Sequence, residues 1–203
     1  SPARYAKTEL WSDLLRSLTA PAGSEPPPAA IADFTRAVAS ALGGKATEAE
    51  LDFKQMELQY PQLAEPSINL GIVLQGDGRL ADAAAALQRG VERSPGNALA
   101  WNELALVRRA LGQFTDAKLA FGQAIAADPA YAPAHRNLGV LLDLYLADPA
   151  AALAEMERYR QLSGEDKPVT GWIAEMRRRT GSKAPAAPAA VAPVAAPVAG
   201  DSK

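Results

Sequence analysis

The chain has 203 residues, of which 48% are hydrophobic and 22% charged, and it carries a formal net charge of −2. A net charge this close to zero generates no long-range field that would attract nucleic acid or an anionic membrane. No stretch of about 20 unbroken apolar residues is present to cross a bilayer, and the absence of cysteine excludes disulfides and thiolate metal sites.

The N-terminal region, residues 1–29, combines an amphipathic segment with a proline-rich linker. Residues 5–18 (YAKTELWSDLLRSL) place apolar side chains at helical spacing, which predicts a helix with one apolar face. Pro21 and the run Gly-Ser-Glu-Pro-Pro-Pro at 23–28 then end that helix and predict a stiff linker. The apolar face consists of Leu10 or Trp11, Leu14, Leu15 and Leu18.

The central region repeats itself every 34 residues. Prolines recur at this step, and an alanine and a large apolar residue precede each of them at constant distances. A fixed period of this length predicts a stacked array of helix pairs without a single compact core. The repeating residues are Pro61, Pro95 and Pro129; Ala49, Ala83 and Ala117; and Phe53, Leu87 and Phe121. The predicted pairs are 30–42 with 46–60, 64–76 with 80–93, 98–111 with 114–127, and 132–146 with 149–162, in repeats of about 30–63, 64–97, 98–131 and 132–166.

The fourth repeat and the residues after it depart from the period. The turn before Pro149 contains no glycine, and the second helix of this repeat fits best if one extra residue is inserted near Pro149. A further helix over 167–180, capped by Asp166, is expected to close the array at 181 with the apolar stripe Val169, Trp172, Ile173 and Met176. Residues 182–203 are rich in alanine and proline and are expected to be a disordered, extended tail.

The stretch 98–129 resembles the tetratricopeptide repeat (TPR) along its whole length. Its signature positions hold Trp101, Leu104, Ala105, Gly112, Phe114, Ala117, Phe121, Ala124, Ile125 and Pro129. The resemblance implies an all-α, right-handed solenoid of about four helix pairs with a C-terminal capping helix. It also implies that the first helix of each pair lines a concave groove, with the fifth, ninth and twelfth positions of each repeat pointing into it.

These groove positions form our candidate binding site for a peptide or a helical segment of a protein partner. The ninth positions form an apolar row of Val38, Ile72, Leu106 and Val140. This row is expected to be covered by a partner or by the helix at 5–18, or else to belong to the core. Arg136 is the preferred polar contact, whereas Arg109 and Asp143 could pair with each other. The expected groove residues are Phe34, Val38, Ile68, Ile72, Gln75, Asn102, Leu106, Arg109, Arg136, Val140 and Asp143.

No group of residues indicates catalysis, a metal site or a cofactor. His135 is the only histidine and occupies the packing position that Trp101 holds one repeat earlier. The Gly-Asp-Gly sequence at 76–78 joins two helices and lacks the strand and the lysine of a phosphate loop. We therefore expect a non-enzymatic interaction scaffold, and the alternative is a structural homo-oligomer, such as a homodimer, that pairs through its N-terminal helix.

Residues 131–149 resemble TPR proteins of the Gram-negative cell envelope, some of which accompany TonB/ExbB-type systems and others pilus secretin assembly. The resemblance implies an adaptor of a bacterial envelope complex, in the periplasm or at the outer membrane. The Ala/Pro-rich tail fits this compartment, although such tails also occur in cytoplasmic proteins. The sequence starts at Ser1, which leaves room for a removed leader or a lipid anchor on a preceding cysteine.

Overall fold

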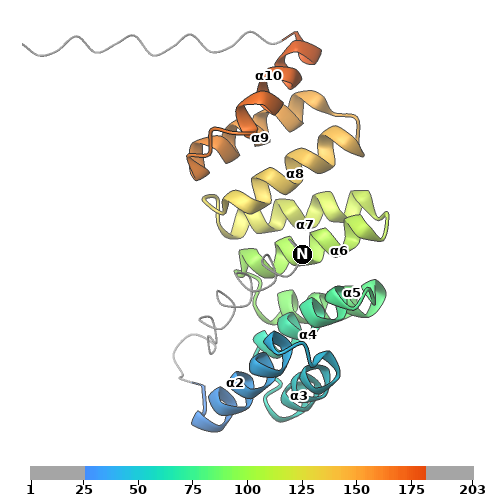
Figure 1. Ribbon diagram of the computed structural model, residues 1–203, viewed down its shortest axis with the longest axis vertical. Helices are drawn as coiled ribbons and strands as arrows, with labels where there is room; N and C mark the ends of the chain where they lie inside the picture. Colours follow the sequence, from blue (N-terminus) through green and yellow to red (C-terminus); the bar gives the residue numbers. More distant parts are fainter. Residues whose placement is uncertain (1–25, 182–203) are drawn as a thin grey trace, which may run out of the picture.

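The computed structural model describes residues 26–181, and this part of the chain is entirely helical apart from its turns. The helices follow one another as antiparallel pairs stacked along the long axis of the molecule (Figure 1). The helices are α2 (Pro28–Leu42), α3 (Ala46–Gln59), α4 (Glu65–Gly76), α5 (Leu80–Arg93), α6 (Ala98–Ala110), α7 (Phe114–Ala127), α8 (Ala132–Leu144), α9 (Pro149–Ser163) and α10 (Val169–Thr180). The amphipathic segment 5–18 and the tail 182–203 lie outside the described residues, so their structures stay predictions.

The turns inside the helix pairs follow the period until the fourth pair. Gly44, Gly78 and Gly112 stand 34 residues apart and adopt nearly the same left-handed φ, between 76° and 78°. The corresponding left-handed residue in the fourth pair is Ala147, with φ 50°, which comes one residue later than the period requires. The extra residue expected near Pro149 therefore lies in this turn, and an alanine adopts a conformation that glycine adopts more easily.

The first helix of each pair lies on the inner face of the array. The helices α2, α4, α6 and α8 contact one another in succession. Within residues 26–181 the second helices α3, α5 and α7 make no comparable contacts with one another. Helices that touch must lie on the inside of a curved stack, so the first helices line the concave face and the second helices the convex face.

The cap helix α10 covers the apolar side of α9 at the end of the array. Val169, Ile173 and Met176 are buried as expected, whereas Trp172 remains 37% exposed on the concave side. The expectation that Asp166 caps this helix through its side chain is wrong. Pro168 holds the cap position, and Asp166 instead accepts a hydrogen bond from the Thr170 amide through its backbone carbonyl.

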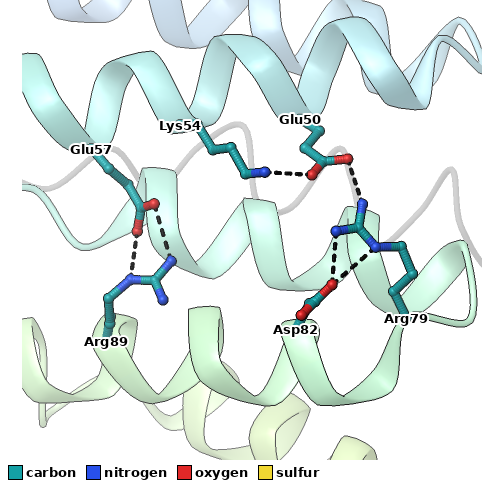
Figure 2. Close-up of polar contacts among 6 residues, drawn as sticks. All are labelled: Glu50, Lys54, Glu57, Arg79, Asp82 and Arg89. Atoms are coloured by element: carbon teal, nitrogen blue, oxygen red, sulfur yellow. Dashed lines mark hydrogen bonds and ion pairs between the residues drawn. The ribbon is translucent and has the colours of Figure 1, made fainter.

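Ion pairs join the first two repeats on the convex face (Figure 2). Glu50 on α3 accepts hydrogen bonds from Lys54 at 2.6 Å and from Arg79 at 2.8 Å, and Arg79 also binds Asp82 on α5. Exposed pairs of this kind contribute about 0–1 kcal/mol each, so they add little to the stability of the array.

One further convex pair is partly buried. The carboxylate of Glu57 on α3 binds Arg89 on α5 through both of its oxygens, at 3.0 and 3.1 Å. Burial alone would raise the pKa of Glu57, but the hydrogen bonds from Arg89 and from the Ser67 hydroxyl outweigh it and lower that pKa. The partly buried carboxylate of Glu57 is thus held in its charged form by its partners.

Candidate functional site

Three of the expected groove residues in the N-terminal half of the array belong to the core. Phe34 and Val38 on α2 are fully buried, and the Phe34 ring packs against Phe53 with centroids 5.9 Å apart. Ile68 on α4 is fully buried against α5, where a Cβ at Gly90 would lie only 2.5 Å from its Cγ1. The expectation that Phe34 and Ile68 face an open groove is therefore wrong, because they contact their own partner helices, and for Val38 the alternative that it belongs to the core holds.

Several of the expected groove residues in the C-terminal half of the array are accessible. Leu106 on α6 and Val140 on α8 are half-buried, and Arg136 on α8 is exposed. The Arg136 guanidinium lies over the Trp172 ring, with Cζ 5.8 Å from the ring centroid, in the geometry of a cation–π contact. Leu144, one helical turn beyond Val140, leaves 69% of its surface exposed.

A pocket of about 320 Å³ opens between α8, α9 and α10 beside these residues. Its walls are mainly apolar, and an ion pair between Asp143 and Arg179 at 2.5 Å lies at its edge. The lining residues are Val140, Asp143, Leu144, Met156, Trp172, Glu175, Met176 and Arg179. Of the alternatives left open for Asp143, a pair with Arg109 is not formed, because the cap helix brings Arg179 to Asp143 instead.

The remaining expected groove residues lie between these two regions. Gln75 on α4 and Arg109 on α6 are both half-buried. Ile72 on α4 is only 6% exposed, although its equivalents Leu106 and Val140 are more accessible. The structure thus groups Arg136, Val140 and Asp143 around the pocket and leaves the other predicted residues away from it.

Two amides and one buried carboxyl form a hydrogen-bonded chain across the inner face between α6 and α8. Asn137 donates a hydrogen bond from Nδ2 to the Oδ1 of Asn102 at 3.0 Å. Asn102 in turn donates from Nδ2 to the Oε1 of Glu103 at 3.1 Å. Burial raises the pKa of Glu103 to about 7, even though the hydrogen bond from Asn102 acts in the opposite direction.

Sequence reasoning missed Glu103 and the pocket residues of α10. Glu103 stands one repeat after Asn69 and one before Asn137, so a carboxylate between two amides at equivalent positions was the available signal. Trp172 was expected as core, and only the angle at which α10 packs shows that its ring faces the groove.

His135 has the structural role that its position predicts. It is buried, and its Nδ1 lies 2.6 Å from the Glu155 carboxylate. Its Nε2 lies 3.2 Å from the Pro129 carbonyl, just as the Trp101 indole binds the Pro95 carbonyl one repeat earlier. The histidine therefore ties the start of α8 to the preceding turn.

Two further kinds of site are not found in residues 26–181. No cluster of three or more histidine, aspartate or glutamate side chains could hold a metal ion there. None of the helices in that part of the chain combines the length and hydropathy required to cross a bilayer.

Comparisons with known proteins identify the fold. No family model and no curated protein matches the sequence. Among solved structures, MamA from Desulfovibrio magneticus RS-1 aligns with a TM-score of 0.66 at 20% identity, over 77% of this chain and 88% of that one. A tetratricopeptide repeat protein from Parabacteroides merdae aligns with a TM-score of 0.67 at 15% identity, over 76% of this chain and 61% of that one.

A third solved structure of the same kind is a peptide complex. The first TPR domain of Spaghetti (RPAP3), bound to the HSP90 peptide SRMEEVD, aligns with a TM-score of 0.55 at 19% identity, over 59% of this chain and 94% of that one. Identities this low establish the fold and nothing about partners. The chain folds as an all-α TPR solenoid.

Proposed function

We propose that this protein is an interaction scaffold that binds a segment of another protein in the C-terminal half of its concave face. The observation that carries the proposal is the apolar pocket of about 320 Å³ beside the exposed Arg136. A solvent-facing apolar pocket with a polar group at its rim is a typical arrangement for ligand binding. The peptide held by the RPAP3 TPR domain, an array of the same fold, supports a peptide as the ligand.

The pocket suggests which ligand fits. Its volume lies at the lower end of the roughly 300–1,000 Å³ of small-molecule sites, which suits one or two apolar side chains of a peptide. Arg136 makes no ion pair within residues 26–181, and its guanidinium lies over Trp172 with donors available. The proposed ligand therefore places an aliphatic or aromatic side chain in the pocket and an acidic group near Arg136.

A matched pair of exposed leucines tests the pocket. Random peptides displayed on phage are selected against the full chain, and the enriched peptides are titrated by fluorescence anisotropy. Leu144→Asp, at the pocket, should weaken binding roughly 10- to 100-fold, because burying a leucine contributes about 1.5–3 kcal/mol. Leu58→Asp, on α3 and 78% exposed, should leave affinity unchanged. Selection of no peptide, or equal binding by both variants, would refute the proposal.

The acidic group has its own test. Arg136→Gln removes the charge while keeping a polar side chain at the same place. It should weaken binding of acidic ligands and reduce the salt dependence of their affinity, and it should not affect ligands in which the acidic residue is replaced by its amide. An equal loss for both ligands would show that Arg136 does not select charge.

We further propose that the partner belongs to a bacterial envelope complex of TonB/ExbB type and that the protein acts in the periplasm or at the outer membrane. The support is the resemblance of residues 131–149 to envelope TPR proteins and the Ala/Pro-rich run at 184–200, which suits a reach-extending tether. Fractionation of the source cells followed by crosslinking in the envelope fraction tests this. Recovery of the protein in the cytoplasmic fraction alone would contradict it.

A further inference from the structure

Exposed apolar side chains gather where the inner helices α6 and α8 end. Leu144 and Tyr145, at the end of α8, leave 69% and 48% of their surfaces exposed, and Leu111, at the end of α6, leaves 37% exposed. The Tyr145 ring packs against the partly buried Phe114 at the start of α7, with centroids 4.8 Å apart. The turn patch, defined as Leu111, Phe114, Leu144 and Tyr145, therefore lies at the rim where inner helices turn into convex ones.

The helical turns of the array do not require these large apolar residues. In the second repeat, the positions of Leu144 and Tyr145 are held by Gly76 and Asp77. In the first repeat, only Leu42 is large and apolar, and a glycine follows it. The fold therefore forms the same turn with small or polar residues, and an apolar patch that stays exposed points to a binding surface.

The turn patch continues the pocket between α8, α9 and α10. Leu144 belongs to both, because it lines the pocket together with Val140. Arg136, Val140 and Leu144 follow one another every four residues and therefore lie along one stripe of α8. At 1.5 Å per residue, the distance along the helix from Arg136 to Tyr145 is about 14 Å. One accessible surface thus leads from the Arg136 guanidinium past the pocket to the turn patch.

The chemistry of this surface favours a helix as its occupant. Val140, Leu144 and Leu111 have apolar side chains, which offer no hydrogen bonds to the backbone N–H and C=O groups of an extended segment. An α-helix satisfies its own backbone groups and can bury an apolar face in a groove. It is also about 10 Å wide, so a single helix can cover Tyr145 and Leu111 on neighbouring turns, since packed helices lie about 8–10 Å apart.

We propose that the partner segment is an amphipathic helix that lies along α8 and extends over its C-terminal end onto the turn patch. This inference rests on the proposed function, because the pocket holds the middle of the same helix. The helix places an acidic residue near Arg136, an apolar residue in the pocket about four positions away, and a second apolar residue on the turn patch about four positions further. The partner segment therefore needs about three helical turns, more than the pocket alone would accept.

Substitutions in the turn patch test the inference. Peptides of about 16 residues, long enough for a helix of about 24 Å, are displayed on phage and selected against the full chain. Tyr145→Ser and Leu111→Ser should each weaken the binding of the enriched peptides at least about fivefold. Leu42→Ser is the matched control, because Leu42 stands at the position of Leu144 in the first repeat and is 43% exposed, and it should leave affinity unchanged. All three variants should keep the far-ultraviolet circular dichroism of the wild type.

The conformation of the bound peptide gives a second measurement that leaves the protein unaltered. An isotope-labelled enriched peptide should show helical Cα chemical shifts in the complex, and extended shifts would overturn the inference. Peptides that lose affinity for Leu144→Asp but bind Tyr145→Ser and Leu111→Ser like the wild type would also overturn it, and would leave the proposed pocket function standing. Selection of no peptide would refute both. A dimer mass in light scattering that Tyr145→Ser and Leu111→Ser each convert to a monomer would overturn the inference in favour of a second copy as the occupant.

Discussion

Glu103 predicts an unusual dependence of stability on pH. Its carboxyl group is buried on α6 with one hydrogen-bond donor, the Asn102 amide, and no cation beside it within residues 26–181. Burial disfavours the charged form and raises the pKa from the ordinary 4.5 to about 7. The folded chain therefore holds this proton over a pH range in which the unfolded chain has lost it.

The sign of the effect follows from this proton. The folded state binds more protons than the unfolded state in this pH range. The stability that the protonated Glu103 carboxyl contributes is therefore fully present below pH 4.5 and is lost as the pH rises through about 7. The difference between the two pKa values corresponds to about 3 kcal/mol, at about 1.36 kcal/mol for each pH unit. At pH 8 the free energy of unfolding of the array should therefore be lower by this full amount than it is at low pH.

The test is Glu103→Gln, which keeps an oxygen acceptor for Asn102 but cannot ionise. Urea unfolding at pH 5 and pH 8 should show the variant gaining up to about 3 kcal/mol over the wild type at pH 8 and little at pH 5. Glu175→Gln, on the surface of α10, controls for a general change in charge. The Glu103 reasoning is refuted if the wild type and Glu103→Gln lose the same stability between the two pH values.

Two substitutions test the helix packing and the irregular turn. Gly71→Ala would place a Cβ 2.5 Å from Leu87 Cγ and should cost about 1–3 kcal/mol in urea unfolding, whereas Gly122→Ala, which meets no atom within 4 Å, should gain up to about 1 kcal/mol through helix propensity. Equal effects at the two glycines would show that the interface between α4 and α5 can relax. Ala147→Gly should raise the free energy of unfolding by about 0.5–1 kcal/mol, and with it the thermal midpoint, because glycine adopts φ 50° without strain. An unchanged or lower midpoint would contradict this.

The sequence predicts the helices well because their determinants are local and repeated. The 34-residue step marks each turn by a left-handed glycine, and it even indicates the extra residue that the structure places at Ala147. The role of His135 follows from the same period, since Trp101 makes the equivalent bond to a proline carbonyl.

The candidate site is harder to predict because it depends on contacts between distant residues. Arg136 and Trp172 are 36 residues apart, and so are Asp143 and Arg179, yet both pairs meet because α10 folds across α8 and α9. The period assigns each residue a position on its helix. It does not state how far the neighbouring helix covers that position.

The apolar row shows this division most directly. Its four members were identified correctly as equivalent positions, but Val38 and Ile72 are buried whereas Leu106 and Val140 remain partly accessible. The sequence by itself determined the repeat, the order of the helices and the inner face, because each of these follows from local spacing. Only the tertiary structure decided which part of that face is open, because burial depends on the angle and reach of segments that the repeat does not encode.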